Sequence, residues 1–524
     1  MMTKEPRLLV DDVLRDTPPA FSAFYLEEPR LVFGGGELSV DPKTGIERFG
    51  PFGSDATGTR RVRLGVIGTG EGIQAFLTFL RRCQTRISAG FNKRGKPLDL
   101  LAFPDFPGCS PDQTFRTEFT CDFAQHRKDI PEELFRRAVT QPQPQSKIEE
   151  VVKLVQQRLE VLEELNPKPD VVVLLMPPIV ERECAAIGSK LARTRLVLSP
   201  QARLQRKLLK QSHKTGQGLL DLEFDSAEPE MQAGRGFYNI HHALKAHAMK
   251  TGLTTQVVWE STLANEHLSS VAWNLFTALY YKAGNTPWRL QTLPEGTCFV
   301  GVSFYKESPH ANADIQTSLA QVFGAGEGMV LKGEKALVDK KRDGKPHLDL
   351  WGSERLLTRA IALYTKHHDD VPPKRVVIHK SSRFWKEEHD GFMRALGGIY
   401  RYDFLTLDTL RIQFMRVGKR PPLRGTVVQL APKRYIFFGN GYVPYLRSYP
   451  GKRVPQPLEV VEHHGVSPAE TVCQELLALT KLNWNSCAFG SSLPITIRFA
   501  RDVGKILSEV PVGQEPQTRH QFYM

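Results

Sequence analysis

A stretch near the middle of the chain decides the fold, and it reads Phe-Tyr-Asn-Ile-His-His-Ala-Leu-Lys at 237–245 and Thr-Thr-Gln-Val-Val at 254–258. His241 and Lys245 are four residues apart in a segment that favours a helix, so both side chains project from one face. Gln256 opens a β-branched run that predicts a strand, and Lys282 ends the helical stretch that follows. An imidazole, two ammonium groups and an amide are suited to holding a phosphate at the edge of a sheet.

This order of residues resembles the MID domain of Argonaute proteins, a family in which the same positions hold the 5′-phosphate of a guide strand. The resemblance implies that His241 stacks on the first base or contacts the phosphate. It also implies that Lys245, Gln256 and Lys282 bind the phosphate directly. Ala278 stands where many relatives carry a further lysine, which implies a less positive pocket. A solvated helix face is the alternative explanation for such a set.

Composition limits the classes of protein that the chain can represent. Its 524 residues are enough for two or three domains, and 41% hydrophobic residues is ordinary for a globular protein. No apolar run of about 18 residues predicts a membrane span, and the first residues contain no apolar signal core. Seven cysteines without CxxC spacing indicate a reducing compartment rather than a zinc site or disulfides. The net charge of +13 favours a polyanionic partner, with solvated surface charge as the alternative, and we expect a soluble cytoplasmic protein.

The chain alternates predicted strands and helices, which indicates an α/β fold with a parallel, Rossmann-like layer. Arg61–Ile67 and Val171–Met176 are predicted strands of this layer. Ser146 and Glu149 form a capping box that predicts the start of a helix between them. That helix has an apolar face made of Ile148, Val151, Val152, Val155, Leu159 and Leu162.

Three parts follow from this pattern. Residues 1–60, rich in Gly and Pro with short extended runs at 31–33 and 49–51, are expected to form an N-terminal arm or linker. Residues 61–290 are assigned to the MID-like domain. Residues 291–524 are assigned to a second α/β domain.

The turn Gly68-Thr69-Gly70-Glu71-Gly72 raises an alternative function. A strand, glycines and a helix start are typical of dinucleotide sites, where helix N-terminal amides meet a phosphate. The third glycine comes one residue early for G-x-G-x-x-G, and Asp99 and Asp105 lie farther on than the expected ribose-binding acid. We therefore expect a tight structural turn, and binding of NAD remains the alternative.

The second domain contains its own recognisable order. Phe299–Phe304 and Arg375–Ser382 are predicted strands, and the chain later reads Leu-Asn-Trp-Asn at 482–485 and Leu-Pro-Ile-Thr at 493–496. This order resembles the PIWI domain, an RNase H-like fold that ends Argonaute chains. The MID-like and PIWI-like regions together cover most of the chain after residue 60.

PIWI nucleases cut a target strand with a tetrad of mostly acidic residues that hold two divalent ions. Carried over residue by residue, the resemblance places Ser303, Ser381 and Arg501 where metal ligands would stand. Two hydroxyls and a guanidinium cannot replace these ligands, so we expect a nuclease fold without nuclease activity. The alternative is residual metal-dependent cleavage through Glu354 and Asp502, although Asp502 is expected to point about 100° away from Arg501 around the helix.

The resemblance is closest to the short prokaryotic Argonautes, which consist of MID and PIWI domains without N or PAZ domains. It implies a guide RNA that pairs with complementary single-stranded invader DNA in prokaryotic immunity. It also implies a heterodimer with an APAZ-containing effector, such as a TIR or Sir2 NADase or a nuclease, and a possible higher assembly on activation. The sequence does not identify the effector, the guide's first base, or RNA rather than DNA as guide.

Two further expectations concern charge at the guide. In relatives the terminal carboxylate helps to hold a structural Mg²⁺ at the guide's 5′ end, which implies Gln256 and Met524 as ligands together with guide phosphates. An apolar anchor is the alternative role for Met524. A basic run is expected to contact the phosphate backbone, with a solvated helix as its alternative: Arg203, Arg206, Lys207, Lys210 and Lys214.

Overall fold

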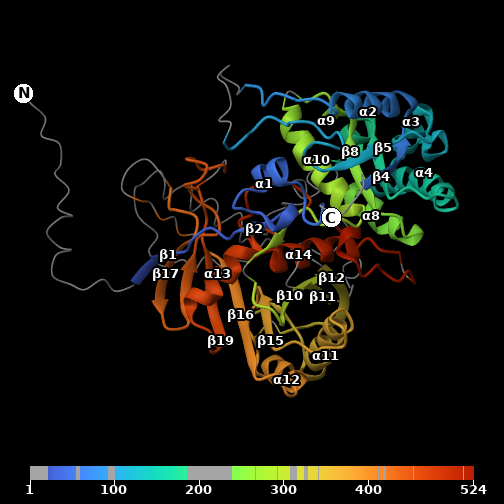
Figure 1. The fold of residues 1–524 in the computed structure, drawn as a ribbon. Helices are drawn as coiled ribbons and strands as arrows, with labels where there is room; N and C mark the ends of the chain where they lie inside the picture. Colours follow the sequence, from blue (N-terminus) through green and yellow to red (C-terminus); the bar gives the residue numbers. More distant parts are fainter. Residues whose placement is uncertain are drawn as a thin grey trace, which may run out of the picture.

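Two main sheets, each covered by helices, lie on either side of the C-terminus (Figure 1). The structure is a computed structural model. It describes residues 22–54, 60–91, 101–185 and 239–524, apart from 266, 292, 307–314, 324–327, 340, 411, 413, 415, 417–420, 452–453 and 512.

The first sheet is parallel throughout. Its order is β5-β4-β7-β8, with β6 beside the far half of β4. Every residue of β7 is buried, as expected for a parallel strand covered on both faces. The predicted parallel layer is therefore confirmed. Its strands are β4 (Arg60–Gly68), β5 (Thr117–Thr120), β6 (Arg127–Asp129), β7 (Val171–Met176) and β8 (Thr255–Trp259).

The helices around this sheet follow the apolar pattern of the sequence. All six apolar residues predicted for one face of α4 are buried. The predicted capping box is wrong, because α4 begins at Pro144 and no side chain caps it; proline fits the first helical turn, where its missing N–H costs nothing. The helices are α2 (Gly70–Arg82), α3 (Glu132–Val139), α4 (Pro144–Glu163), α5 (Pro178–Val180), α8 (Ile240–Ala248), α9 (Glu260–Leu263) and α10 (Leu268–Lys282).

The second sheet has nine strands in the order β1-β17-β18-β19-β16-β15-β10-β11-β12. Three parallel strands form its centre, and antiparallel strands continue on both sides. A separate hairpin, β13 with β14, follows β12. The strands are β10 (Thr297–Lys306), β11 (Ile315–Phe323), β12 (Gly328–Lys335), β13 (Leu337–Val338), β14 (Pro346–His347), β15 (Arg375–Lys380), β16 (Arg401–Thr409), β17 (Thr426–Ala431), β18 (Arg434–Phe437) and β19 (Leu458–Gly465).

Alternation along the central strands separates two faces of the second sheet. Val300, Val302 and Ile378 pack in one cluster with residues of α11 (Leu350–Lys366) and α12 (Lys386–Leu396). Phe299 and Val377 face the opposite side and pack in the main core, which includes α13 (Ala469–Leu479) and α14 (Ile495–Leu507). The second sheet is therefore a three-layer structure.

The first sixty residues, expected to form an arm or linker, contribute strands to two sheets of the fold. β1 (Ser22–Tyr25) is the edge strand of the second sheet, and β2 (Leu31–Val32) pairs with both β3 (Leu38–Ser39) and β9 (Arg289–Leu290). The extended run predicted at 49–51 is wrong, because α1 (Pro42–Phe49) occupies its start. The side chain of Asp41 accepts a hydrogen bond from the Thr44 amide at 2.9 Å and caps this helix.

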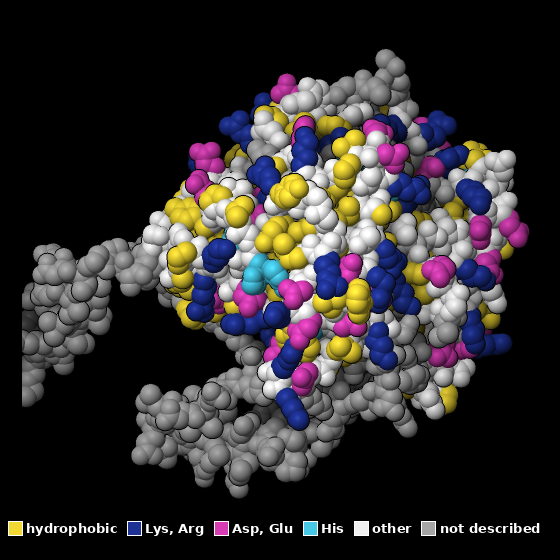
Figure 2. All heavy atoms as spheres, turned by 90° about the horizontal axis from the view of Figure 1, so that it is seen from below, with side chains coloured by type: hydrophobic (Ala, Val, Ile, Leu, Met, Phe, Trp, Pro, Cys, Tyr) yellow, Lys and Arg dark blue, Asp and Glu magenta, His cyan; other side chains and the backbone are white. Residues whose placement is uncertain are grey.

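The surface does not by itself reveal a partner. On the face shown in Figure 2, Lys and Arg side chains are interspersed with Asp and Glu and with scattered hydrophobic groups. Among the described helices, none combines the length and apolar character needed to cross a bilayer. All seven cysteines are buried free thiols.

Candidate phosphate-binding site

The four predicted phosphate residues come from three neighbouring elements. His241 and Lys245 lie on α8, which Asn239 caps by accepting hydrogen bonds from the amides of the first turn. Gln256 lies on β8 and Lys282 is the last residue of α10. The predicted helix, strand and helix end are confirmed, and the chain brings these side chains together around the end of the first sheet.

Lys282 links the strand to the helix. Its ammonium donates to the backbone carbonyl of Thr255 at 2.7 Å and to the side-chain oxygen of Gln256 at 2.6 Å. The Gln256 amide nitrogen donates in turn to the Val257 carbonyl at 3.0 Å. Only 2% of Lys282 is exposed, and among the described residues its ammonium donates to neutral oxygen atoms alone.

Lys245 is likewise buried and hydrogen-bonded to a neutral oxygen atom. It is 5% exposed, and its ammonium donates to the backbone carbonyl of Tyr523 at 3.3 Å. The carboxylate of Asp502 acts on it electrostatically but is not within ion-pair distance in the described structure. The two predicted lysines therefore share one environment: buried, close together and without a bound carboxylate.

Among the residues that the structure describes, the other buried lysines and arginines are all matched by carboxylates. Lys380 pairs with Glu388, and Lys481 lies 2.8 Å from Glu28. Burying an unpaired charge is costly, so an unmatched buried lysine needs a reason other than stability. The remaining matched pairs are Arg375 with Asp403 and Glu475, and Arg424 with Glu28.

Burial and mutual repulsion shape the protonation of this site. Burial lowers the pKa of Lys245 to about 8, opposed by Asp502. Burial, followed by the nearby Lys245, holds the pKa of Lys282 well below its ordinary value. Burial and then the two lysines hold the pKa of His241 well below 6.5, so its imidazole is uncharged at neutral pH. Such shifts cluster where proteins bind charged ligands.

The last residues of the chain pack against the elements that carry the site. Three glutamine side chains donate to backbone carbonyls of this region: Gln514 to Ala246 at 3.1 Å, Gln517 to Met249 at 3.0 Å, and Gln521 to Tyr281 at 3.3 Å. Met524 is 6% exposed and joins the main core. Glu509 accepts from the Asn239 amide at 3.0 Å, and burial raises the pKa of its carboxyl to about 7.

A surface hollow of about 340 Å³ lies beside the site, on α14, which packs against α8. Arg501 and Asp502 both line it. Lys505 pairs with Asp502 at 2.9 Å and, with Asp502, acts on His242. Sequence reasoning missed Arg498 and Lys505, although the basic face of this amphipathic helix was readable. The lining residues are Ser492, Leu493, Arg498, Arg501, Asp502 and Lys505.

Comparisons with known proteins agree on one architecture, although no protein-family model matches the chain. Protein argonaute of Aquifex aeolicus (strain VF5) is 24% identical over 271 residues, which are 51% of this chain and 36% of that protein. The structure of Clostridium butyricum Argonaute, bound to a guide DNA with a 5′ deoxycytidine and a 19-mer target DNA, matches with a TM-score of 0.60 at 14% identity. The match covers 94% of this chain and 54% of that one. The chain has the Argonaute fold.

Two other structures with the Argonaute fold match similarly. Drosophila Piwi gives a TM-score of 0.56 at 13% identity, covering 95% of this chain and 56% of its own. Marinitoga piezophila Argonaute, solved with a 5′ OH guide RNA, gives a TM-score of 0.53 at 10% identity. The match covers 92% of this chain and 58% of that one. The chain thus spans little more than half the length of these structures.

Within the Argonaute fold, two expected metal positions fall side by side. Gly301 of β10 lies against Thr496 of α14, and His379 of β15 is 2.7 Å from the Thr496 hydroxyl. Ser303 lies two residues further along β10, and Ser381 directly follows Lys380, the last residue of β15, which pairs with Val302. None of the described contacts joins Arg501 to either serine.

Glu354 does not join these positions. It lies on α11, whose Leu356 and Leu357 pack against the opposite face of the second sheet. Among the described residues, no group of three His, Cys, Asp or Glu side chains is arranged to hold a metal. The geometry therefore gives no support to Glu354 as a replacement ligand.

In the turn at Gly68–Gly72, the carboxylate of Glu260 occupies the space beside the start of α2. Thr69 accepts from the Gly72 amide at 2.9 Å and donates to Glu260 at 3.0 Å. A Cβ at Gly72 would lie 2.1 Å from that Glu260 oxygen, and one at Gly68 would lie 2.7 Å from Leu175. The glycines serve close packing, and a carboxylate at the helix N-terminus repels a dinucleotide phosphate. The predicted structural turn is confirmed, and NAD binding there is disfavoured.

The basic run at 203–214, which was expected to contact the phosphate backbone, lies outside the described residues.

Proposed function

We propose that this chain is a short, guide-binding Argonaute that does not cut nucleic acid. The observation that carries the proposal is the pair of buried lysines, Lys245 and Lys282, which no carboxylate of the described residues matches. A guide's terminal phosphate supplies the missing anion. In this proposal residues 61–290 form the MID domain and residues 291–524 form an inactive PIWI domain.

The site suits a terminal phosphate for specific reasons. Two ammonium groups donate charge-assisted hydrogen bonds, which gain strength where water is excluded. Gln256 keeps Lys282 in place, and its amide nitrogen would exchange its hydrogen bond to the Val257 carbonyl for one to the phosphate. His241 is uncharged, so its contribution is ring stacking or a neutral hydrogen bond rather than charge. Arg498, Arg501 and Lys505 in the adjoining hollow suit the next backbone phosphates.

The proposal includes no catalysis by this chain. Ser303 and Ser381 offer hydroxyls where hard divalent ions require carboxylates. Base pairing of a guide RNA with single-stranded invader DNA would then activate an effector, and the DNA would not be cut by this chain. An associated APAZ-containing effector, a TIR or Sir2 NADase or a nuclease, would carry the chemistry in prokaryotic immunity.

The proposal also includes a structural Mg²⁺ at the guide's 5′ end, for which the Gln256 oxygen would have to exchange its present hydrogen bond from Lys282. Gln256 presents an amide oxygen, and Met524 ends the tail whose Tyr523 carbonyl contacts Lys245. Hard oxygen atoms are the ligands that Mg²⁺ prefers, and guide phosphates would complete the set. Bound there, the ion would neutralise phosphate charge. Independently of it, Lys245 and Lys282 hold the terminal phosphate.

Guide binding provides the test. The protein is purified with whatever accompanies it, and the extracted nucleic acid is end-labelled before and after phosphatase. Short RNAs that label only after phosphatase would establish a 5′-phosphorylated guide. With defined guides, Lys245→Ala and Lys282→Ala should each weaken binding by about 1–3 kcal/mol and remove the preference for a 5′-phosphate over a 5′-hydroxyl.

Lys250→Ala is the matched control, because Lys250 follows α8, is exposed and pairs with Glu160 at 3.1 Å. Its guide affinity should equal that of the unchanged protein. Equal binding of both guide ends by the unchanged protein would refute the assignment; the 5′ OH guide RNA of the Marinitoga structure makes this comparison necessary. Metal-dependent target cutting by the guide-loaded protein would refute the non-cleaving part and favour the residual nuclease.

A further inference from the structure

Glu509 connects the end of α14 to the start of α8, the helix that carries His241 and Lys245. Its Oε1 accepts a hydrogen bond from the Asn239 amide at 3.0 Å. Asn239 is the N-cap of α8, and its side chain accepts from the amides of His241 and His242 at 2.9 and 3.3 Å. In a capping box, a glutamate at the third helical position accepts from the N-cap amide. That position in α8 is His242, so Glu509 supplies the missing acceptor from the segment after α14.

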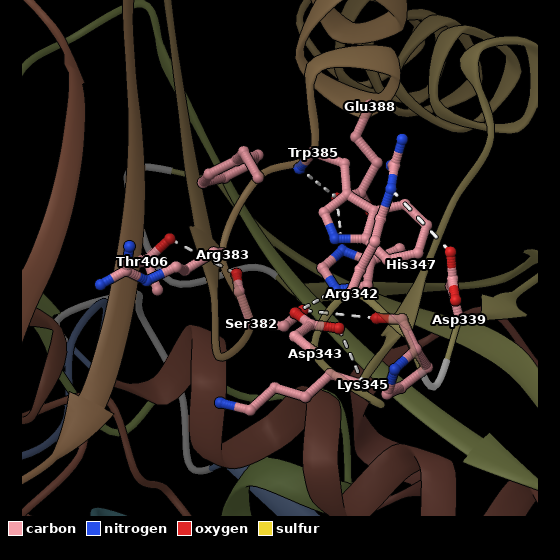
Figure 3. A network of polar contacts seen from close by, with 12 residues as sticks. Asp339, Arg342, Asp343, Lys345, His347, Ser382, Arg383, Trp385, Glu388 and Thr406 are labelled. Atoms are coloured by element: carbon pink, nitrogen blue, oxygen red, sulfur yellow. Dashed lines mark hydrogen bonds and ion pairs between the residues drawn. The ribbon is translucent and has the colours of Figure 1, made fainter.

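Among the described residues, Glu509 is the buried glutamate that has no cation beside it. The other three each form an ion pair with a lysine or an arginine: Glu388 with Lys380, Glu459 with Arg434, and Glu475 with Arg375. Figure 3 shows the surroundings of Glu388, which also lies 2.9 Å from Nδ1 of His347. Glu509 is 7% exposed, and its Oε2 has no hydrogen-bond partner in the described structure. Capping α8 does not require such a carboxyl, because an amide of the same shape would accept the hydrogen bond without burying a charge.

The surroundings of Glu509 favour its neutral form. Burial raises the pKa of this carboxyl to about 7, and the hydrogen bond from Asn239 opposes the rise only in part. In the described structure it forms no ion pair with the titratable side chains from the facing parts of α8 and α14: His241, His242, Lys245, Asp502 and Lys505. The carboxyl therefore exchanges its proton with solvent near neutral pH.

We propose that Glu509 is a positioning residue of the phosphate site, which holds the first turn of α8 through Asn239 and takes up a proton when the guide's terminal phosphate binds. The phosphate brings negative charge to the helix that Glu509 caps, and a nearby like charge disfavours an ionised carboxyl. The proton comes from solvent and stays on the carboxyl, whose other oxygen continues to accept from the Asn239 amide. This inference rests on the proposed function, because it requires a phosphate in that site.

The test compares three variants of the full chain. Glu509→Gln keeps the shape and an oxygen acceptor but cannot ionise, whereas Glu509→Ala removes the acceptor. Glu515→Gln is the matched control, because it removes an exposed carboxylate shortly after Glu509 in the chain. Affinity for guides that differ only in a 5′-phosphate or a 5′-hydroxyl is measured between about pH 6 and pH 8, on both sides of the Glu509 titration.

The unchanged protein and Glu509→Gln should diverge with pH. Near pH 6 they should bind the phosphorylated guide within about twofold of each other, and near pH 8 the unchanged protein should bind it at least about threefold more weakly, because it alone carries the carboxylate. The 5′-hydroxyl guide should show no such divergence. Glu509→Ala should bind the phosphorylated guide more weakly than Glu509→Gln at both pH values, since α8 loses its anchor. The control should follow the unchanged protein.

The guide-free proteins test the carboxyl itself. Its pKa is about 7 in the fold and 4.5 in the unfolded chain, so the folded state binds more protons between these values. The urea midpoint of the unchanged protein should therefore fall relative to that of Glu509→Gln as the pH rises from about 5 to about 7. Parallel urea midpoints would overturn the inference.

The guide measurements separate this inference from the proposed function. Parallel pH profiles for the unchanged protein and Glu509→Gln with the phosphorylated guide would overturn the inference, and so would a divergence of equal size with both guide ends. Equal binding of both guide ends by the unchanged protein, with urea midpoints that diverge as expected, would instead refute the proposed function. The inference would then fall with it, although Glu509 titrates.

Discussion

Buried lysines lie near both main sheets of this protein, and the two sets differ in whether a carboxylate pairs with them. On the side of the second sheet, Lys380 of β15 and Lys481, in the turn after α13, are matched by Glu388 and Glu28. Near the first sheet, Lys245 and Lys282 are as buried but, within the described part of the chain, donate only to carbonyl and amide oxygens. A matched cation serves the fold, whereas an unmatched one leaves the fold prepared for an anion. The difference locates the candidate site more sharply than the overall charge does.

The largest expected effect comes from breaking a matched pair. Lys380→Met leaves the Glu388 carboxylate, which is fully buried, without its ammonium partner. Loss of one partner of a buried pair costs about 3–5 kcal/mol. The urea midpoint should fall, and amide exchange in β15 should accelerate. The preference for 5′-phosphorylated guides should persist.

The unmatched lysine supplies the contrast. In Lys282→Met, the loss of two hydrogen bonds from the ammonium to neutral oxygen atoms is opposed by the removal of a desolvated charge, so stability should stay within about 1 kcal/mol. Guide affinity should fall as predicted for Lys282→Ala. Equal losses of stability in Lys380→Met and Lys282→Met would erase the distinction between the two kinds of lysine.

A smaller effect is expected from pH. The unfolded chain keeps Lys245 near its ordinary pKa of 10.5, whereas burial lowers its pKa to about 8 in the fold. Between these values the unfolded state binds more protons, so Lys245 makes the free energy of unfolding rise with pH, by up to about 1.4 kcal/mol per unit.

Guide affinity should move the other way, falling above about pH 8 as the empty site loses its proton. Both trends are measured against Lys245→Met, which should lack them, and Lys250→Met, which should retain them. Identical pH profiles for the unchanged protein and Lys245→Met would show that this ammonium does not titrate in the window.

The smallest effect is expected at His241. Because its pKa is held well below 6.5, its ring acts uncharged, and His241→Tyr should keep guide affinity within about threefold. Affinities are compared near pH 6 and pH 7.5. A loss in the variant confined to the lower pH would indicate an imidazolium–phosphate contact instead.

Periodicity predicted the regular elements well. The strand Val171–Met176 and the end of a helix at Lys282 match the structure, because a continuous apolar run and a terminal charge are local signals. The start of α4 was missed, since Ser146 offers a capping pattern that Pro144, a good first-turn residue, overrides. The role of β1 was not readable either, because its partner β17 lies about four hundred residues away.

The site was predictable in part for the same reason. The spacing of His241, Lys245 and Gln256 is local and carries the resemblance. That Lys245 meets the Tyr523 carbonyl, and that no carboxylate accompanies it, depends on tertiary packing. The hollow on α14 likewise depends on that helix packing against α8. Sequence reasoning identified the groups but not their missing counter-charge.

The pairing of β1 with β17 also has a consequence for synthesis. Ser22 opposes Gln429, so the edge of the large sheet waits for a partner made 407 residues later. At about 5–20 residues per second, a ribosome needs roughly 20–80 s to deliver it. Until then β1 is a strand without its neighbour, exposed to other chains. Translation rate and chaperone supply should therefore govern the yield of folded protein more than the stability of the finished molecule does.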